Sequence, residues 1–218
     1  NGIQTLDLIK AWAAQKTENG TALIIGQHGG HYGTGLWSFS EEHEIAICDR
    51  YLSWGWNDKD KPKVYPVGQI KNIAPLGINH AEQSRILLVT ATLPRYSYYM
   101  YSVLVSSQWL DYLEDQFTFT EKLHPAMQNN LTVRLYVEDS GWDQQKRWSD
   151  RFPNIALDLG KKNIDELIAK SRLYVATYNC ATYLQSFTMN IPTVIFWNPQ
   201  HWEIRDAAIP YFDELKQV

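Results

Sequence analysis

The sequence predicts an α/β protein in which helices alternate with the strands of parallel sheets. The clearest sign is the stretch from Arg172 to Trp197. A β-branched and aromatic run at Arg172–Ala176 indicates a buried strand, the pattern of Ala181–Met189 fits a short helix, and Thr193–Trp197 is a second apolar strand. Strand, helix and strand in this order form a βαβ unit, in which the two strands are parallel. The same alternation continues along most of the chain.

The first series of elements precedes residue 68. Leu6, Ile9, Trp12 and Ala13 have helical spacing, and a serine followed by acidic residues indicates a second helix. Short apolar runs between turns indicate strands. In chain order we expect the helix Leu6–Lys16, the strand Thr21–Ile25, the helix Ser40–Asp49, and the strands Tyr51–Trp54 and Lys63–Val67.

A second series begins after Gly68–Arg85, a stretch without pattern that contains Pro75, Gly77 and Asn79 and reads as a linker. The longest helix of this series is amphipathic, with Trp109, Leu110, Leu113, Phe117 and Leu123 on its buried side. Before Arg172 we expect the strand Ile86–Ala91, the helix Ser106–Leu123, the strand Leu131–Val137, the helix Asp143–Phe152, the strand Asn154–Leu159 and the helix Ile164–Ala169. A last helix follows from about Ile204 to Lys216. The second series should form a parallel sheet of about five strands with helices on both faces.

Composition narrows the class of function. The chain has 218 residues and a formal charge of −4, with a pI near 5.9, so it lacks the basic footprint of a nucleic-acid-binding protein. No apolar run reaches the length of a membrane span, and no signal peptide opens the chain. Cys48 and Cys180 lie far apart without metal-type spacing, as expected of free thiols in a reducing compartment. We expect a cytoplasmic protein and, since it begins at Asn1 and ends directly after a helical pattern, a fragment of a longer one.

A glycine-rich loop with two histidines follows the first strand. Gly26–Gly35 contains five glycines in ten residues, together with His28 and His31. Glycine permits close approach of a ligand, and histidine exchanges protons near neutral pH. This composition favours a functional loop, built from His28, Gly29, Gly30 and His31, over a plain flexible one. A zinc site made by His28, His31 and His43 is the weaker alternative, because no cysteine or paired carboxylate accompanies them, and we expect no metal.

A polar turn joins the strand Arg172–Ala176 to the helix that follows it. Its residues are Tyr178, Asn179, Cys180 and Thr182. A helix N-terminus at the carboxyl end of a parallel strand favours an anion, and doubly wound domains hold nucleotide phosphates there. The alternative is that Asn179 and Thr182 only cap the helix. No glycine lies in the turn, so neither a Walker loop nor a dinucleotide fingerprint is present.

Four long motifs carry a family resemblance. They are QHGGHYG at Gln27–Gly33, EEHEIAICDRYLSWGW at Glu41–Trp56, VRLYVEDSGW at Val133–Trp142, and TYNCATYLQSFTMNIPTVIFWNP at Thr177–Pro199. With these motifs the chain resembles the GT-B glycosyltransferases, and among them the LIC12162-like bacterial surface-carbohydrate transferases. More distantly it is similar to the CDP-glycerol glycerophosphotransferases and to the Kdo and sialic acid transferases.

The resemblance implies a GT-B-like fold of two Rossmann-like domains facing a cleft, the first one incomplete. Residues 1–75 would be the C-terminal part of the acceptor-side domain, and residues 76–218 the nucleotide-sugar-binding domain. His28-Gly29 matches the His-Gly pair that supplies a catalytic histidine in the glycerophosphotransferases. Tyr136-Val137 stands where the CMP-sugar transferases have His-Pro, which leaves the base of the donor open.

The resemblance also implies a function, a glycosyltransferase that builds surface polysaccharide. It would move a sugar from a nucleotide-activated donor, its substrate, to a glycan or lipid-linked acceptor, without a cofactor. A lipid-linked acceptor would allow peripheral association with the inner face of the membrane. The implied catalytic residues are His28 and His31, with Gly29, Gly30, Arg95 and Tyr96 in the loops of the cleft. The implied donor-binding residues are Arg134, Asp139, Tyr178, Asn179, Cys180, Thr182 and Glu203. For two of these residues a structural role is the alternative. Arg134 would be an ordinary surface residue of a strand, and Glu203 would be an acidic residue that interacts with the dipole at a helix N-terminus.

Two other classes of protein remain open. A nucleotide-sugar epimerase also uses two Rossmann-like halves, and it would place acidic residues such as Glu41, Glu42 and Glu44 beside the histidine loop. A non-catalytic carbohydrate-binding module would use the aromatic loop Tyr96–Tyr101.

Overall fold

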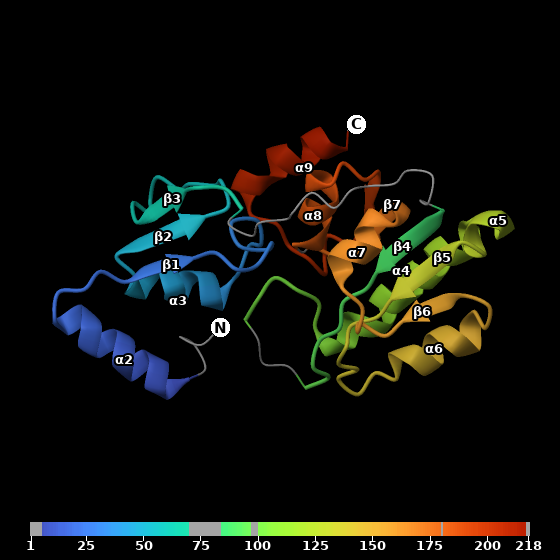
Figure 1. The fold of residues 1–218 in the computed structure, drawn as a ribbon, viewed down its shortest axis with the longest axis horizontal. Coiled ribbons are helices and arrows are strands. Elements are labelled where there is room, and N and C mark those ends of the chain that lie inside the picture. The colour runs from blue at the N-terminus through green and yellow to red at the C-terminus, as the bar shows by residue number, and fades with distance from the viewer. Residues whose placement is uncertain (1–5, 70–83, 97–99, 180, 217–218) are drawn as a thin grey trace. The chain divides into compact units, whose positions relative to one another are not determined.

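The computed structural model describes residues 6–69, 84–96, 100–179 and 181–216. The chain forms two compact units (Figure 1). Unit 1 contains residues 1–72 together with residues 205–218, and unit 2 contains residues 73–204. The C-terminal segment therefore belongs with the first series of elements, which differs from the expected second domain ending at residue 218. Most of the expected linker, residues 70–83, lies outside the described residues.

Unit 2 is built on a five-stranded sheet in the order β6-β5-β4-β7-β8. All four neighbouring pairs are parallel, which confirms the predicted sheet. The strands are β4 (Arg85–Val89), β5 (Leu131–Arg134), β6 (Ala156–Asp158), β7 (Ser171–Ala176) and β8 (Thr193–Ile195).

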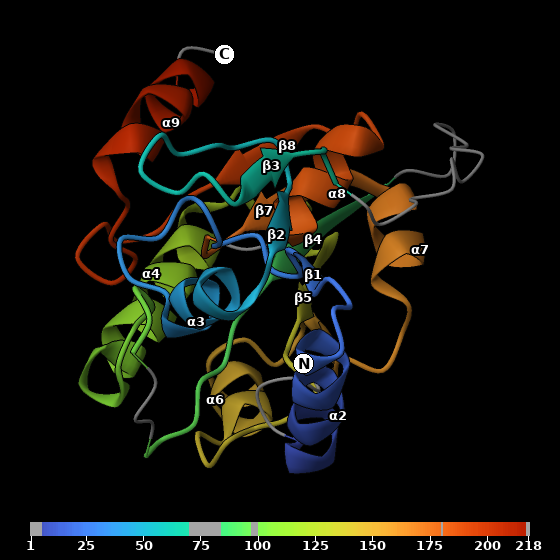
Figure 2. The same cartoon turned by 90° about the vertical axis from the view of Figure 1, so that its left-hand side faces the viewer.

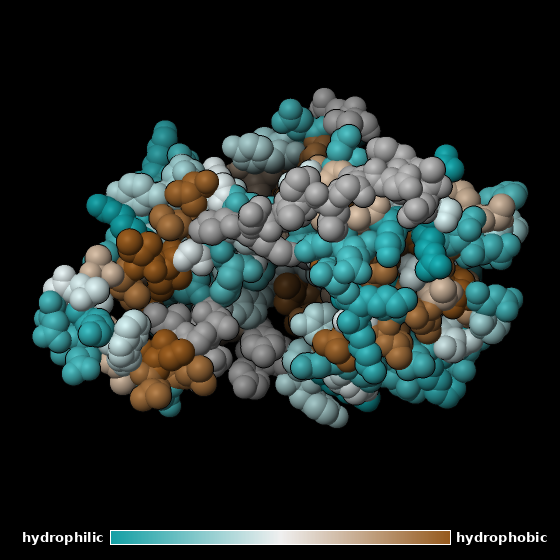
Figure 3. All heavy atoms as spheres, viewed as in Figure 1, coloured by the Kyte–Doolittle hydropathy of each residue, from teal (hydrophilic) through white to brown (hydrophobic). Residues whose placement is uncertain are grey.

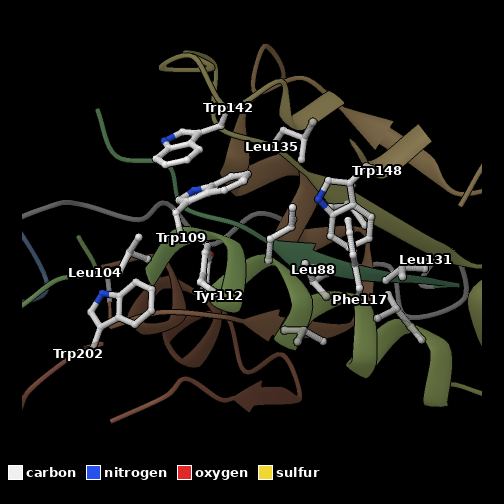
Figure 4. Packing of buried hydrophobic residues seen from close by; sticks show 14 residues of the cluster. Leu88, Leu104, Trp109, Tyr112, Phe117, Leu131, Leu135, Trp142, Trp148 and Trp202 are labelled. Atoms are coloured by element: carbon white, nitrogen blue, oxygen red, sulfur yellow. The ribbon is translucent and has the colours of Figure 1, made fainter. Parts of the chain in front are cut away.

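Helices cover both faces of this sheet, as the strand pattern predicts. Ile86 and Leu88 of β4 pack in one apolar cluster, and Leu87 and Val89 pack in the other, because alternate side chains of a strand point to opposite faces. The first cluster is rich in tryptophan (Figure 4), and the rings of Trp109 and Trp142 stack with centroids 4.5 Å apart. Side chains of the helices α4 (Trp109–Lys122) and α6 (Gln144–Arg151) pack in this cluster, and side chains of α7 (Ile164–Ala169) and α8 (Thr182–Thr188) pack in the second.

Unit 1 contains a smaller sheet in the order β1-β2-β3, again with parallel neighbours (Figure 2). Its helix α3 begins after Ser38, whose side chain accepts a hydrogen bond from the Glu41 N–H, so the cap is Ser38 and not the expected Ser40. Ile45, Cys48, Tyr51 and Val64 form its buried core. The elements are α2 (Asp7–Glu18), β1 (Ile24–Gly26), α3 (Phe39–Ile47), β2 (Arg50–Ser53), β3 (Val64–Pro66) and α9 (Ile209–Leu215).

The first helix has the expected helical spacing, yet only Ala13 of α2 is buried. Leu6, Leu8 and Trp12 are more than half exposed, and apolar side chains gather over α2 in Figure 3. Spacing determines which side chains share a helix face, whereas burial requires a neighbouring element to cover that face. Leu110 of α4, expected on the buried side, is exposed for the same reason.

Several boundaries differ from the expected ones. The strand predicted over Leu131–Val137 ends at Arg134, because Tyr136 and Val137 are exposed instead of alternating into the core. A 3₁₀ turn at Ser106–Gln108 precedes α4, another at Asp206–Ala208 precedes α9, and the short helix α5 (Pro125–Gln128) is unpredicted. Among the helices described here, none combines the length and apolar character that crossing a membrane requires.

Candidate active site

The histidine loop leaves the carboxyl end of β1 and is held in shape by Gln27. The Gln27 side chain is buried, donates to the Gly29 carbonyl at 2.8 Å and accepts from the Trp54 N–H at 2.8 Å and the Trp56 indole at 2.9 Å. Gly33 has a φ of +77°, and a Cβ there would come within 2.3 Å of the Trp56 ring. The loop is therefore a fixed turn that requires glycine at position 33.

His28 lies beside a fully buried carboxylate. Its Nε2 is 3.3 Å from Glu44 Oε1 and 3.3 Å from the Tyr32 hydroxyl, and its ring stacks on Tyr32. The His28 side chain is 41 % exposed while that of Glu44 is 0 % exposed. Burial lowers the pKa of His28, so the imidazole is neutral at pH 7. A neutral ring that donates Nε2–H to Glu44 carries its lone pair on Nδ1, and the carboxylate stabilises the cation formed when Nδ1 takes a proton.

His31 is the second histidine of the loop and is more enclosed. Its Nε2 is 3.4 Å from the Ser38 hydroxyl, and its ring contacts that of Tyr32. Burial lowers the pKa of His31 to about 4, Glu41 opposes this effect, and His28 and Arg205 reinforce it. His31 is therefore neutral throughout the physiological range.

This lowered pKa predicts a loss of stability in acid. The folded state takes up a proton on His31 near pH 4 and the unfolded chain near pH 6.5, so the stabilising difference is complete above pH 6.5 and is lost as the pH falls toward 4. The loss is at most about 3 kcal/mol. Urea unfolding at several pH values should show a flatter profile for His31→Asn than for the wild type, while His124→Asn, at an exposed position, should follow the wild type. Parallel profiles for the wild type and His31→Asn would contradict this origin of the acid sensitivity.

Glu41 joins the loop to two cations. Its carboxylate is buried, accepts the Gly33 N–H at 2.6 Å and the Arg205 guanidinium at 2.9 Å, and lies 3.5 Å from the Lys61 ammonium. From the sequence, Glu41 and Glu44 have a role only under the epimerase alternative, and no role is predicted for Tyr32 or Arg205. The spacing of Ser38 and Glu41 is that of a capping box, but Glu41 reaches the loop instead of the helix start. No local pattern points to Arg205.

The strand order of unit 2 has its topological switch point between β4 and β7. After β4 the chain adds β5 and β6 on one side of β4, and then β7 and β8 on its other side. The loops that follow β4 and β7 therefore lead away in opposite directions, which defines a topological switch point. One hydroxyl network ties these loops together: the Tyr112 hydroxyl accepts from the Ala91 N–H at 2.7 Å and lies 2.6 Å from Thr177 Oγ1, which donates to the Val89 carbonyl. In open α/β sheets, ligands bind outside the carboxyl ends of strands at such a point.

The predicted capping turn after β7 is arranged differently. The cap of α8 is Ala181, which makes no side-chain cap bond. Asn179 is buried and accepts from the Tyr183 hydroxyl, and Thr182 accepts from the Tyr174 hydroxyl at 2.5 Å. Tyrosine hydroxyls thus bind the side chains of both residues, which the sequence assigned either to phosphate binding or to capping the helix. Tyr178 remains in this turn, and Cys180 lies outside the described residues.

Two of the predicted donor ligands have partners inside unit 2. Arg134 lies 2.6 Å from the Asp158 carboxylate and donates to the Gly160 carbonyl. Asp139 accepts the backbone N–H groups of Asp143 and Gln144 at the start of α6. Partial burial raises the pKa of Asp139, but the hydrogen bonds from backbone N–H groups have a larger combined effect and hold the pKa below its usual value. Among these bonds, the one from Gln144 contributes most. Both side chains thus have their partners within the unit itself.

The remaining predicted residues lie on the loops after β4 and β8. Arg95 donates to the Gly141 carbonyl at 3.4 Å and lies over the Trp142 ring. An open cavity of about 390 Å³ is lined there by Pro94, Arg95, Tyr96, Ser140 and Gly141. Tyr96 and Glu203 are exposed. Within the described ranges, no group of three or more His, Cys, Asp or Glu side chains is arranged to hold a metal ion.

Comparison with known proteins gives a family and a fold. The model of the LIC12162 family transferases matches residues 1–218. No curated protein is similar enough to this sequence to count as a match. Among solved structures, a point mutant of TarM from S. aureus, in complex with fondaparinux, alpha-GlcNAc-glycerol and UDP, matches with a TM-score of 0.50 and 11 % identity. The match covers 79 % of this chain and 36 % of that one. This likeness confirms the expected GT-B-like α/β fold. Since the family model spans the whole chain, the protein belongs to the LIC12162 family transferases.

Proposed function

We propose that the protein is a glycosyltransferase that moves a sugar from a nucleotide-activated donor to a hydroxyl group of a glycan or lipid-linked acceptor. The observation that carries this proposal is His28 beside the buried Glu44, on a fixed loop at the carboxyl end of β1. A transferase of this kind needs a base for the acceptor hydroxyl, and a neutral histidine held by a carboxylate is suited to that task.

In the proposed reaction the acceptor oxygen attacks the anomeric carbon of the donor sugar. The bond between that carbon and the phosphate oxygen breaks, and the nucleoside phosphate leaves with the bonding electrons. His28 Nδ1 takes the proton of the acceptor hydroxyl, and Glu44 stabilises the resulting imidazolium. The nucleotide is itself the leaving group, so the bonds of this step balance without a further reactant.

The donor nucleotide is assigned to the switch point of unit 2, at the loops after β4 and β7. The switch point in the strand order, together with the fixed network of Tyr112 and Thr177, supports this assignment. Arg95, on the loop after β4, supplies a cation for the phosphates, while Arg134 stays with Asp158. A UDP-sugar is the first donor to test, because the S. aureus structure holds UDP. A lipid-linked acceptor would bring the enzyme to the cytoplasmic face of the membrane.

A binding experiment tests the donor site with a matched pair of variants. UDP, CDP and CMP should be titrated calorimetrically into the wild type, Thr182→Asp and Thr188→Asp. Thr182 lies at the start of α8 and Thr188 at its end, so both substitutions add one carboxylate to the same helix. Repulsion of the phosphates should weaken binding roughly tenfold or more in Thr182→Asp and leave Thr188→Asp near the wild type. Equal affinity in both variants would place the phosphates elsewhere.

The epimerase alternative retains one observation in its favour. Glu41 and Glu44 do lie beside the histidine loop, as that function would require. Glu41, however, is occupied by Gly33, Arg205 and Lys61, and the family is one of transferases. Incubation with a nucleotide-sugar and no acceptor separates the two functions, because an epimerase interconverts the sugar and a transferase does not.

A further inference from the structure

Arg205 binds the segment that follows the catalytic histidines of the loop. Its backbone N–H donates to the Thr34 carbonyl at 2.9 Å, and its Nε donates to the Gly35 carbonyl at 3.0 Å. One terminal nitrogen donates to Glu41 Oε1 at 2.9 Å, and the guanidinium lies 5.6 Å from the centroid of the Trp56 ring. Only 18 % of the Arg205 side chain is exposed. These contacts join position 205 to residues about 170 positions earlier in the chain.

Together with Glu41, this arginine fixes three consecutive loop residues. Glu41 binds the Gly33 N–H, and Arg205 binds the carbonyls of the next two residues, Thr34 and Gly35. Gln27 fixes the other end of the loop through Gly29. A glycine-rich segment is costly to order, so holding both ends of the loop helps to define the positions of His28 and His31.

Arg205 also pairs with one of two neighbouring buried carboxylates. Glu41 and Glu44 lie three positions apart on one face of α3, and both are buried. Arg205 and Lys61 supply positive charge to Glu41, and His28 lies beside Glu44. A planar guanidinium can donate to a carboxylate and a carbonyl at once, which a lysine ammonium cannot reproduce in the same geometry.

We infer that Arg205 is a positioning residue for the proposed transfer reaction, acting on His28 through the loop and through the charge of Glu41. The inference rests on the proposed function, because it assigns the loop a part in catalysis. This inference gives the C-terminal segment a role in the acceptor-side chemistry, although the segment lies far along the sequence from the histidine loop.

The test compares Arg205→Gln and Arg205→Lys with Arg151→Gln. Arg151 also pairs with a glutamate, Glu121, at 2.6 Å, but on the surface, so it controls for the loss of an ion pair. Misplacing a catalytic group by about 1 Å costs roughly a hundredfold in rate, so Arg205→Gln should lower kcat about tenfold to a hundredfold. KM for the donor should change little, since the donor is assigned to unit 2. Arg151→Gln should match the wild type.

The pH profile distinguishes positioning from plain stabilisation. The charged and titratable groups beside the histidines include Glu44 and Tyr32 at His28, and Tyr32, Glu41, His28 and Arg205 at His31. Arg205→Gln removes a positive charge near the histidines and keeps Glu41, which favours the protonated form of the histidines. The acidic limb of the pH profile of kcat should therefore move to higher pH in this variant. Arg205→Lys keeps the charge, and should show a lowered kcat with the limb unmoved. An arginine that only stabilises the fold would leave the limb in place in both variants.

Hydrogen exchange at the Gly33 N–H supplies a readout that does not depend on activity. Its protection should fall in both Arg205 variants and stay unchanged in Arg151→Gln. Wild-type kcat and wild-type Gly33 protection in Arg205→Lys would overturn the inference, even if Arg205→Gln fails to fold. Normal turnover in His28→Ala would instead overturn the catalytic role of His28, while lost Gly33 protection would still show that Arg205 holds the loop.

Discussion

His28→Ala should lower the turnover number by at least a hundredfold. General acid–base catalysis contributes roughly a hundred- to ten-thousandfold to enzymatic rates, and alanine removes the only atoms of this residue that can take a proton. The fold should survive, because the His28 side chain is 41 % exposed. Donor affinity should change little, since the donor is assigned to the other unit. Steady-state rates of nucleotide release with a competent donor and acceptor, together with calorimetric donor binding, measure both quantities.

The control is His124→Asn. His124 is exposed at the start of α5, where its Nδ1 accepts the Ala126 N–H, and asparagine preserves such a cap. Turnover of this variant should equal that of the wild type. If His28→Ala turned over as fast as the wild type and His124→Asn, His28 would not be the base, and His31 would become the candidate base of the loop.

Glu44→Gln examines the partner of His28 separately. The amide keeps the shape of the carboxylate and removes its charge, so it should lower turnover by less than His28→Ala. Residues that act as a unit are strongly non-additive, and the double variant should therefore be no slower than His28→Ala alone. An additive loss in the double variant would show that the two residues act independently.

Asp158→Ala should destabilise unit 2 by about 3 kcal/mol or more, the usual cost of leaving one member of a buried ion pair without its partner. Asp158 is 4 % exposed and Arg134 is 15 % exposed, and their nearest charged atoms are 2.6 Å apart. Arg134→Met should cost a similar amount, while the double variant Arg134→Met/Asp158→Ala should recover much of the loss because no unpaired charge remains. Urea unfolding of the four proteins measures this cycle.

The matched control is Asp150→Ala, which breaks the exposed pair of Lys146 and Asp150 and should leave the unfolding midpoint nearly unchanged. The same proteins decide whether Arg134 is a donor ligand. An Arg134 that only supports the fold predicts that Arg134→Met/Asp158→Ala binds nucleotide like the wild type. Strong loss of nucleotide binding in this double variant, with stability recovered, would return Arg134 to the donor site.

The sequence by itself determined the fold class and the place of the histidine loop. Strands and helices arise from the period of apolar side chains, which is written locally, and the helix Ile164–Ala169 was predicted with its observed bounds. The parallel five-stranded sheet follows from the alternation of strand and helix, and a crossover helix forces neighbouring strands to be parallel. His28 lies where the sequence places it, in the loop that follows the first strand.

Only the tertiary structure decided which side chains meet. Arg134 pairs with Asp158, 24 positions away, and Arg205 pairs with Glu41, 164 positions away, and no local pattern encodes either partner. Asn179 and Thr182 have the composition of helix caps, and the fold also brings the hydroxyls of Tyr183 and Tyr174 onto their side chains. Periodicity is a property of residues that are neighbours along the chain. A buried polar group, in contrast, must form a hydrogen bond with a group that the fold brings within reach, so the path of the whole chain determines its partner.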